Sequence, residues 1–356
     1  MKKTVAMLMA AAMVVGCAGC SEKTDSAPKA DGQAEQTEQS AETAVASAGA
    51  ITLKVASDYS KTEPIGEALE KWTELVKERG DGSVEVVVYP DSQLGGKTDI
   101  IDACLMGEPD IAFADPAFMA EYGVNDLGIL FGPFLFDDRA QCKTLTDSDW
   151  YQEQCAKLEE KGLKVIDSTW ITGVRHLLTN KPVTLPEDLK GMKIRVPANQ
   201  IQTESFNVLG ASATAMNLSE VYTALQTGTI DGGENPLSTL YNRKFQEESK
   251  YLCKTGHVRV IGMFVMSSDV WNRLSEDQQQ LLSSTLAEGG EEYNVEQEKA
   301  DADYEQKFKD EGVTITELTD EQRAKWVEAS EPFYADGKKF GWSDNLYDTV
   351  LKAIGK

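Results

Sequence analysis

Strand-like and helix-like segments alternate along most of this chain, and that alternation limits the folds available to it. Short β-branched or alternating apolar runs predict strands, while apolar spacings of three and four residues predict amphipathic helices. The pattern predicts an α/β fold with parallel sheets whose strands are joined by helices. In the first half the expected strands are 51–56, 84–89, 110–114 and 162–166, and the expected helices are 64–79, 97–106 and about 138–160.

A second set of alternating segments follows, and then the chain becomes mainly helical. Residues 277–311 predict one unusually long helix, in which Gly289-Gly290 could introduce a bend or a break. Ser275-Glu-Asp-Gln278 and Thr319-Asp-Glu-Gln322 resemble capping boxes and predict helix starts. The other expected elements are strands at 192–196 and 229–231, helices at 198–208 and 218–227, and an apolar β-rich stretch at 258–266 that could run between domains.

The first twenty residues predict an export signal. Two lysines precede an apolar run over residues 5–15, which is typical of a signal peptide and too short to span a membrane. The run ends in Val14-Val15-Gly16-Cys17, which resembles the bacterial lipoprotein cleavage box. We therefore assign 1–20 to a lipoprotein signal peptide with Cys17 as the lipidated residue. Cys20 and an ordinary secretory signal are the alternatives.

Residues 21–50 predict a disordered tether. The segment has no aromatic residue, and Val45 is its only large apolar side chain. Such a segment cannot bury enough apolar surface to order itself, and a random coil of this length reaches ~30 Å. The folded part is therefore expected to begin near Ile51 and to be exported, which argues against chemistry that needs cytosolic ATP or NAD(P)H.

Composition and missing motifs exclude several classes of function. The chain has 35 Lys+Arg against 59 Asp+Glu, and an acidic surface repels nucleic-acid phosphates. Its only histidines are His176 and His257, so no multi-histidine metal site can be built. No cofactor is expected. The chain has no GxSxG, HExxH, GxGxxG or GxxxxGK[ST] motif. An exported hydrolase is the weaker alternative, because its triad would need one of two histidines that we expect to be structural.

Four cysteines follow the signal segment, and their pairing is open. They are Cys104, Cys142, Cys155 and Cys253, and none belongs to a CxxC pair. Disulfides can form in exported proteins, but buried free thiols explain the same residues. Four cysteines allow three connectivities, so the sequence does not choose between these alternatives.

Charge is unevenly distributed along the chain. Residues 275–335 hold 17 Asp+Glu against 5 Lys+Arg, which indicates a solvated helical face or, alternatively, a face that docks a partner. Residues 170–200 form a basic island with five Lys+Arg and two Asp+Glu. Arg175 and Arg195 in this island could hold a carboxylate through paired N–H donors. Alternatively, both could bridge surface carboxylates.

A series of short motifs resembles one family. Through these motifs the chain resembles the solute-binding proteins of tripartite ATP-independent periplasmic (TRAP) transporters, specifically the C4-dicarboxylate-binding type. The resemblance covers essentially all of 51–356. The motifs are Gly173-Val-Arg175, Pro186-Glu-Asp-Leu-Lys-Gly-Met-Lys-Ile-Arg195-Val-Pro197, Leu209-Gly-Ala211, Ser219-Glu-Val-Tyr-Thr-Ala-Leu-Gln-Thr-Gly228 and Asp231-Gly-Gly-Glu-Asn-Pro-Leu237. Tyr89-Pro90, Gln93-Leu-Gly95, Phe134-Leu-Phe136, Lys250-Tyr-Leu252 and Thr255-Gly-His257 fit the same pattern.

The resemblance implies a binding protein outside the cytoplasm rather than an enzyme. Two α/β lobes joined by a hinge would close around one small organic acid and deliver it to the small and large subunits of a membrane permease. Lobe I would comprise 51–173 and about 261–295, and lobe II would comprise 174–260 and about 296–356. The long helix would span both lobes. The protein is expected to be a monomer in the periplasm or on the outer face of the cytoplasmic membrane, held there only by its lipid.

The resemblance also implies the ligand contacts. Arg195 matches the family arginine that pairs with the ligand carboxylate, Arg175 matches a second ligand-facing arginine, and Asn235 matches a ligand-contacting amide. Asp231 and Glu234 are expected to fix a turn or an interlobe contact instead. Further expected contacts, each with a structural role as the alternative, are Asp58, Lys97, Asp115, Trp170 and Asn217.

The ligand itself is less closely determined than the fold. Where many family members carry a histidine and a His-Pro pair, this chain has Ser57 and Glu63-Pro64. Asp58 and Asp115 accept hydrogen bonds when ionised, so they favour hydroxyl groups and oppose a second ligand carboxylate. We therefore expect a hydroxylated sugar acid such as a uronate or aldonate. The alternatives are a C4-dicarboxylate, with Lys97 as the extra cation, or a ligand-sensing receptor module.

Overall fold

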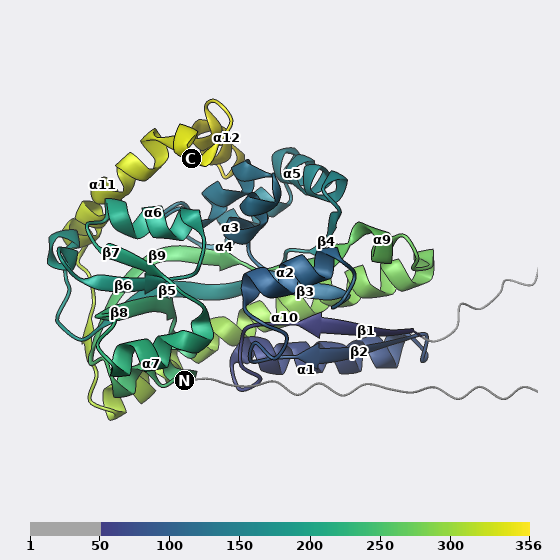
Figure 1. The fold of residues 1–356 in the computed structure, drawn as a ribbon, viewed down its shortest axis with the longest axis horizontal. Coiled ribbons are helices and arrows are strands. Elements are labelled where there is room, and N and C mark those ends of the chain that lie inside the picture. The colour runs from purple at the N-terminus through teal and green to yellow at the C-terminus, as the bar shows by residue number, and fades with distance from the viewer. Residues whose placement is uncertain (1–50) are drawn as a thin grey trace, which may run out of the picture. The chain divides into compact units, whose positions relative to one another are not determined.

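The structure, a computed structural model, describes residues 51–356. Two β-sheets lie within this part of the chain, and helices cover both of them (Figure 1). The predicted signal peptide, the lipidation site Cys17 and the tether all fall outside the described residues. No described helix is both long enough and apolar enough to cross a membrane.

The first sheet contains five strands in the order β2-β1-β3-β10-β4. The parallel arrangement predicted from the alternation is confirmed for β1, β2 and β3. It is wrong for β10, which runs antiparallel to both β3 and β4 because it returns from the second sheet. The strands are β1 (Ile51–Ala56), β2 (Val84–Tyr89), β3 (Ile111–Ala114), β4 (Leu163–Asp167) and β10 (Met263–Ser267).

Helices of the first lobe follow the predicted pattern with one correction. The helix expected near 138–160 is divided in two, because Asp138 caps one helix and Ser148 caps the next. Each side-chain oxygen accepts a backbone N–H that would otherwise be unpaired at a helix start. The helices are α1 (Pro64–Arg79), α2 (Lys97–Leu105), α3 (Pro116–Met119), α4 (Arg139–Thr146), α5 (Asp149–Glu160) and α9 (Ser268–Trp271).

The second sheet contains six strands in the order β11-β9-β5-β8-β6-β7 and is also mixed. The strand predicted at 229–231 is wrong, because the strand in this region starts at Gly232, just after the predicted range ends. The Asp231 side chain instead accepts hydrogen bonds from the Lys193 N–H, at the start of one neighbouring strand, and from the Asn180 amide, just after the end of another. The strands are β5 (Ile171–Thr179), β6 (Lys193–Val196), β7 (Ser212–Ala215), β8 (Gly232–Pro236), β9 (Tyr251–Ile261) and β11 (Thr314–Thr316).

Three short helices pack around this second sheet. They are α6 (Gln200–Val208), α7 (Val221–Gln226) and α8 (Leu237–Asn242). The helix expected at 218–227 is a single 3₁₀ turn, Leu218–Glu220, followed by α7. The predicted helix at 198–208 is confirmed with its start at Asn199, whose side chain accepts the Gln202 N–H.

A single helix, α10 (Glu276–Asp310), joins the two lobes, as the sequence predicts. It is 35 residues long and begins at the capping box of Ser275. Its first half packs Leu282 and Leu286 into the core beside β1, and its second half packs Tyr304 and Phe308 beside β9. In Figure 1 it passes both sheets.

The glycine pair does not break α10, which is continuous from Glu276 to Asp310. A Cβ added at Gly290 would lie 2.3 Å from Thr169 Oγ1 and 2.7 Å from the Trp170 ring. These glycines therefore make room for the segment that connects β4 to β5. Gly262 lies in the other connection between the lobes, which joins β9 to β10. Its N–H donates to the Trp170 carbonyl at 2.7 Å, so the two connections are joined by a hydrogen bond.

The C-terminal segment contributes to the cores of both lobes. Trp326 packs with Leu177 of the second lobe, whereas Phe333 and Val350 share the core that contains Ile100 of the first lobe. The core that residues 333–354 share is built mainly from first-lobe residues, with Ile201 and Val258 from the second lobe. The predicted boundaries, which place all of 296–356 in the second lobe, remain a prediction. The segment is built from α11 (Asp320–Ala335), which starts at the predicted capping box of Thr319, and α12 (Leu346–Ala353).

The four cysteines within residues 51–356 are free thiols. Burial raises the pKa of Cys104, Cys142 and Cys253 to about 12 each. Thiols this far from ionisation are weak nucleophiles and behave as small apolar side chains. Of the two alternatives, the structure therefore supports buried free thiols.

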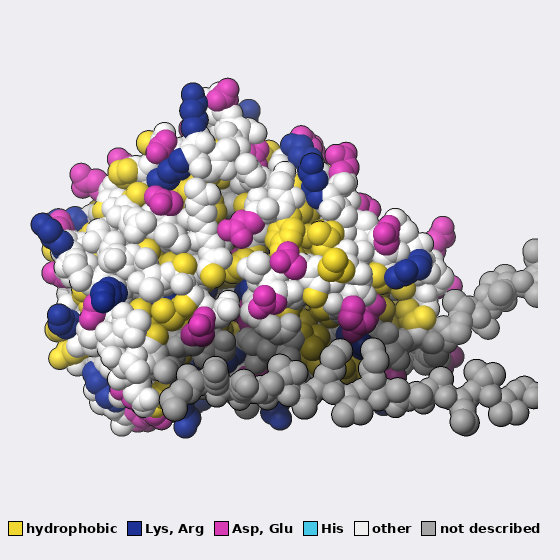
Figure 2. Space-filling model, in the orientation of Figure 1, with side chains coloured by type: hydrophobic (Ala, Val, Ile, Leu, Met, Phe, Trp, Pro, Cys, Tyr) yellow, Lys and Arg dark blue, Asp and Glu magenta, His cyan; other side chains and the backbone are white. Residues whose placement is uncertain are grey.

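Acidic side chains do not form one continuous patch on the face of the molecule that Figure 2 shows. On the face shown in Figure 2 they are dispersed among neutral and apolar side chains. The acidic residues 276–310 of α10 fit this pattern, because several form isolated surface ion pairs, such as Glu296 with Lys71 and Glu288 with Arg79. Exposed pairs of this kind contribute only ~0–1 kcal/mol each to stability.

Candidate ligand-binding site

Seven of the eight predicted ligand contacts line one pocket between the lobes. In parallel α/β sheets such residues meet because the carboxyl ends of neighbouring strands lie along one edge. Asp58 follows β1, Asp115 follows β3, and Asn217 follows β7. The predicted residues in the pocket are Asp58, Lys97, Asp115, Arg175, Arg195, Asn217 and Asn235.

Trp170 is the exception, and its predicted ligand contact is not supported by its position. Its side chain is completely buried in the core of the first lobe. The indole N–H donates to the Leu286 carbonyl at 2.8 Å, and the ring stacks on Tyr293 with centroids 5.2 Å apart. Its role is to pack the connection between the lobes against α10.

Arg195 is a buried cation without a carboxylate partner in residues 51–356. Its Nε and Nη2 both donate to the Met216 carbonyl, at 3.1 and 2.7 Å, and the residue is 3% exposed. Burial, and then the charge of Arg175, lower the pKa of Arg195 to about 10. The guanidinium remains protonated at neutral pH, so this part of the pocket favours an anion.

Arg175 differs from Arg195 because the protein supplies its counter-ion. Its Nε and Nη2 donate to the two carboxylate oxygens of Glu234 at 2.5 and 2.7 Å. Burial alone would raise the pKa of Glu234, but the Arg175 charge and its hydrogen bonds lower it to about 2. Glu234 does not line the pocket, as predicted. Of the two predicted alternatives, a turn or an interlobe contact, the interlobe contact does not apply to Glu234, because Glu234 and its partner Arg175 both belong to the second sheet.

His257 completes this buried cluster and is neutral. Its Nε2 lies 3.1 Å from Glu234 Oε2, and its Nδ1 lies 2.7 Å from Thr255 Oγ1. An ionised carboxylate only accepts hydrogen bonds, so Nε2 carries the proton and Nδ1 accepts from the threonine hydroxyl. Burial lowers the pKa of His257, and this also favours the neutral ring. The histidine is therefore structural, as the sequence predicts.

Lys97 lies between the two aspartates of the first lobe. Its Nζ is 3.1 Å from Asp115 Oδ2 and 3.4 Å from Asp58 Oδ1. Burial opposes its charge, but Asp58 and other neighbours raise its pKa above the ordinary value. The ammonium also lies 5.0 Å from the centre of the Tyr59 ring. These three charged residues together leave one net negative charge on this side of the pocket.

Two buried polar atoms of the pocket have no hydrogen-bond partner among the described residues. They are Asp58 Oδ1, an acceptor on the first lobe that has the Lys97 ammonium 3.4 Å away but makes no hydrogen bond, and Asn235 Nδ2, a donor on the second lobe. Leaving a buried polar group unpaired costs ~1–3 kcal/mol. A ligand that offers a hydroxyl to Asp58 and an oxygen to Asn235 would therefore recover this free energy.

The two lobes approach each other closely around the pocket. A Cβ added at Gly96 of the first lobe would lie 2.6 Å from Asn217 Oδ1 of the second lobe, so only glycine permits this contact. The pocket holds about 20 Å³ of free space, roughly enough for one water molecule. Small-molecule pockets are typically ~300–1,000 Å³, so the lobes must move apart to admit an organic acid.

Sequence reasoning missed several apolar residues of the pocket. Tyr59 and Phe118 come from the first lobe, and Pro197, Met216 and Leu218 come from the second. Four of the five directly follow or precede a predicted contact or its strand. Extending each predicted contact or strand by one residue would therefore have included these four, but not Phe118, which is three residues from Asp115.

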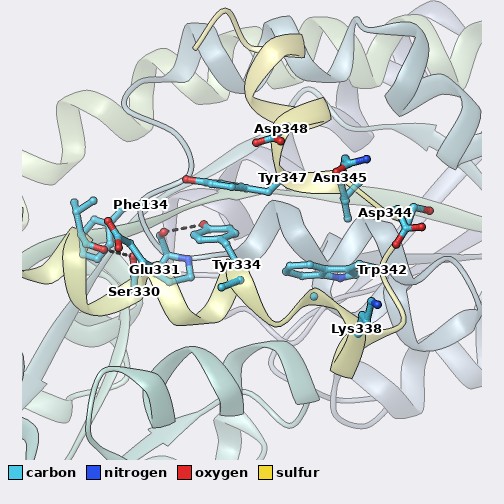
Figure 3. A pocket seen from close by; sticks show the side chains of 16 residues that line it. Phe134, Ser330, Glu331, Tyr334, Lys338, Trp342, Asp344, Asn345, Tyr347 and Asp348 are labelled. Atoms are coloured by element: carbon cyan, nitrogen blue, oxygen red, sulfur yellow. Dashed lines mark hydrogen bonds between the residues drawn. The ribbon is translucent and has the colours of Figure 1, made fainter.

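A larger cavity lies elsewhere, between the C-terminal helices (Figure 3). Its volume is about 480 Å³, and it contains Tyr334 stacked on Tyr347 with ring centroids 4.1 Å apart. None of the predicted ligand contacts lines it. Within residues 51–356, no group of three His, Cys, Asp or Glu side chains is arranged to hold a metal ion.

Comparison with known proteins identifies the family. Residues 55–339 match the model of the bacterial extracellular solute-binding proteins, family 7. The chain belongs to this family. A C4-dicarboxylate-binding periplasmic protein of Rhodobacter capsulatus is 30% identical over 80% of this chain and 85% of that protein. The 2,3-diketo-L-gulonate-binding periplasmic protein of Escherichia coli is 33% identical over 68% of this chain and 74% of that protein.

Solved structures of family 7 proteins share the fold. A TRAP solute-binding protein from Ochrobacterium anthropi with bound L-fuconate is 36% identical, with a TM-score of 0.82 over 86% of this chain and all of that one. One from Actinobacillus succinogenes with bound L-galactonate is 32% identical, with a TM-score of 0.82 over 85% and 99%. The two-lobed α/β fold predicted from the sequence is confirmed.

Membership of family 7 confirms the main functional predictions. The chain is an extracytoplasmic solute-binding protein of the TRAP transporter type and not an enzyme. Proteins of this family bind small organic acids and work with TRAP membrane permeases. The roles predicted for the individual pocket residues remain predictions.

Proposed function

We propose that this protein captures a hydroxylated sugar acid, an aldonate or a uronate, between its lobes for delivery to a TRAP permease. The observation that carries the proposal is that one pocket contains both a buried cation and a buried hydrogen-bond acceptor that a ligand could satisfy. Within residues 51–356, Arg195 is a buried cation without a carboxylate partner. Asp58 Oδ1 is a buried acceptor that makes no hydrogen bond there, although the Lys97 ammonium lies 3.4 Å away. A carboxylate at one end of the ligand and a hydroxyl at the other satisfy both.

The charges in the pocket favour a ligand with one carboxylate. Glu234 neutralises Arg175, while Lys97 offsets only one of the two aspartates beside it. A single ligand carboxylate is matched by Arg195. A second would approach the first lobe, where Asp58 and Asp115 leave a net negative charge, and like charges in a buried site repel strongly.

Sugar acids bound to related structures support the proposal. Two of the similar solved structures, each at least 32% identical to this chain, hold L-fuconate and L-galactonate, which are both hydroxylated monoacids. The second candidate is a C4-dicarboxylate, which the name of the Rhodobacter capsulatus relative favours. Lys97, its predicted extra cation, is less suited to that role because two aspartates already surround it.

Thermal-shift screening of the purified protein tests this choice. The screen compares L-fuconate, L-galactonate and D-galacturonate with succinate and L-malate at equal concentrations. A bound ligand raises stability by RT ln(1 + [L]/Kd), about 2.7 kcal/mol at a hundred times Kd. We expect at least one sugar acid to raise the melting temperature. A shift with succinate or malate but with no sugar acid would reject the proposal in favour of the second candidate.

Capture works by a shift between open and closed lobes. The pocket draws Asp58 and Lys97 from the first lobe and Arg195 and Asn235 from the second, so one ligand contacts both lobes only when they are closed. A ligand shifts such an equilibrium by its difference in affinity for the two states. Water is excluded on closure, and this strengthens the ion pair with Arg195.

Attachment to the membrane through Cys17 belongs to the same proposal. A diacylglycerol on this cysteine supplies two acyl chains, which suffice for stable anchoring, and residues 21–50 would let the binding domain reach the permease. Mass spectrometry of the N-terminal peptide from membrane fractions tests it, with Cys17→Ser expected to release the protein. Retained anchoring in that variant, with loss in Cys20→Ser, would move the site to Cys20.

The remaining structural assignments are a monomer and a division into two lobes. We propose the predicted boundaries with one amendment, in which residues 333–354 belong to the first lobe because they pack in its core. Light scattering of the purified protein measures the mass. A ligand-sensing receptor would use the same closure, and transport of the ligand by cells that express the permease distinguishes the two roles.

A further inference from the structure

We propose that Glu63, Thr239 and Arg243 form an interlobe latch that sets ligand affinity without contacting the ligand. Glu63 precedes α1 in the first lobe, while Thr239 lies in α8 and Arg243 directly follows it in the second lobe. None of the three lines the ligand pocket. The inference rests on the proposed capture by lobe closure and identifies a second set of contacts that closure must form.

Arg243 connects the second lobe to three groups of the first lobe. Its Nη2 donates to the Asp58 carbonyl at 2.5 Å and lies 3.8 Å from Asp91 Oδ1. Its Nε is 3.4 Å from Glu63 Oε1. The side chain is 16% exposed, so most of it is removed from water by the contact. Because the Asp58 side chain lines the pocket, Arg243 holds the backbone of a predicted ligand contact in place.

Glu63 is the buried half of the latch. The residue is 0% exposed, and its Oε2 accepts the Thr239 hydroxyl at 2.5 Å. Its Oε1 accepts the Ser60 N–H at 2.9 Å, a bond within the first lobe that survives lobe opening. When the lobes separate, Glu63 loses Thr239 and Arg243 but keeps Ser60. Closure therefore exchanges water around this carboxylate for one hydroxyl and one guanidinium.

Single and double substitutions in the latch should differ in how strongly they destabilise the closed form. Removing one partner of a buried ion pair leaves an uncompensated charge and is costly, whereas replacing both partners by neutral groups costs much less. The open form pays neither penalty because Glu63 is then in contact with water. Loss of Arg243 alone should therefore disfavour the closed form, and apparent affinity falls with the fraction of closed-competent protein.

Stopped-flow measurements of ligand binding test the latch. The probes are L-fuconate and L-galactonate, and the variants are Arg243→Gln, Arg243→Lys, Thr239→Val, Glu63→Gln and the double variant Glu63→Gln/Arg243→Gln. We expect Arg243→Gln to raise Kd at least tenfold, mainly through faster dissociation, and to raise it equally for both ligands. Arg243→Lys and Thr239→Val should have smaller effects, and the double variant should recover part of the affinity.

Two matched substitutions serve as controls. Glu247 is a partly exposed carboxylate that binds Tyr222 and Lys244 within the second lobe, so Glu247→Gln should leave Kd unchanged. Arg273 is exposed and makes no ion pair within the described residues, so Arg273→Gln should also have no effect. Circular dichroism of each variant checks folding. If Glu63→Gln fails to fold, Arg243→Lys still tests the latch.

Small-angle scattering of the ligand-free protein separates the latch from the choice of ligand. Arg243→Gln should increase the radius of gyration relative to the unsubstituted protein and to Arg273→Gln, whichever ligand the protein takes. If neither sugar acid binds the unsubstituted protein while this shift is present, the proposed ligand fails and the latch stands. An unchanged radius together with an unchanged Kd in Arg243→Gln would overturn the latch. A change in the ratio of the two affinities would also overturn it, because ligand recognition rather than closure would then be affected.

Discussion

Arg175 and Glu234 form a buried ion pair between the adjacent strands β5 and β8, with two N–O distances of 2.5 and 2.7 Å. Among the described residues, Arg195 on the neighbouring strand β6 donates only to the Met216 carbonyl. The two arginines expected to share a ligand carboxylate therefore have different electrostatic roles. Arg175 is neutralised within the protein, and Arg195 is the cation that a ligand carboxylate can match.

Substitution of Arg195 should remove ligand binding. Truncating one partner of a buried, hydrogen-bonded charge pair costs ~2–5 kcal/mol, which is a loss of affinity of about 30-fold to several thousandfold. Arg195→Ala should show no measurable binding by calorimetry. Arg195→Lys keeps the charge but loses the two-pronged geometry, so its Kd should still rise strongly. Near-native affinity in either variant would remove Arg195 from this role, and Arg273→Lys is the control.

Substitution of Glu234 should lower stability and change its dependence on pH. At neutral pH, Glu234→Gln leaves the Arg175 charge buried and unpaired, with an expected loss of ~3–5 kcal/mol in unfolding free energy. The pKa of Glu234 is lowered to about 2 in the folded protein from an ordinary value of 4.5. Its contribution is therefore fully present above pH 4.5 and is lost as the pH falls toward 2.

Denaturant unfolding at a series of pH values measures this contribution. Burial raises the pKa of Asp167 and of Asp301 to about 6, so these groups add stability as the pH falls below 6 and partly mask the effect of Glu234. The difference between the unsubstituted protein and Glu234→Gln removes this background. That difference should shrink between pH 4.5 and 2, and a constant difference would contradict the assigned ion pair.

Substitution of Asp58 should distinguish the two ligand classes. Hydrogen bonds to charged groups contribute ~1.5–3 kcal/mol, so Asp58→Asn should weaken sugar-acid binding by about 10- to 150-fold. Removing a negative charge should not weaken a dicarboxylate, and it should improve its affinity relative to the sugar acid. Calorimetric titration with L-fuconate and succinate checks both outcomes. Asp102→Asn, at a carboxylate that binds only Tyr122 on the surface, is the matched control.

The two glycines of α10 should respond differently to alanine. At Gly290 a new Cβ would lie 2.3 Å from Thr169 Oγ1, and such overpacking costs ~1–3 kcal/mol. At Gly289 the nearest atom would be 3.1 Å away, and the ~1 kcal/mol gain in helix propensity opposes the strain. Thermal unfolding should therefore place Gly290→Ala well below Gly289→Ala. Equal melting temperatures would show that the Trp170 connection can move aside.

Local pattern was sufficient for most elements of the fold. The spacing of Ile65, Leu69 and Trp72 determined α1, and the capping residues Ser275 and Thr319 located the starts of α10 and α11, because these signals act within one or two turns of helix. The direction of β10 was not predictable in the same way. Its strand-like sequence is the same for parallel and antiparallel pairing, and only the path of the chain between the lobes decides the direction.

The candidate site was predicted through resemblance rather than through local pattern. Motif matches selected Arg195, Arg175 and Asn235, which line one pocket, and strand ends bring Asp58 and Asp115 to its other side. Trp170 was misplaced because proximity in sequence to Arg175 does not specify the direction of a side chain. The latch of Glu63 with Arg243 had no sequence signal, since the two residues are far apart in the chain and meet only across the lobes.

The sequence by itself determined the α/β pattern, the long acidic helix and a basic island within a chain of net charge −24, because composition and periodicity are properties of neighbouring residues. Only the tertiary structure decided how the charges are paired. It gave Arg175 a partner in Glu234, left Arg195 for a ligand, and surrounded Lys97 with two aspartates. Coulomb energy depends on the distance between charges and on their burial, and neither quantity can be read from the sequence alone.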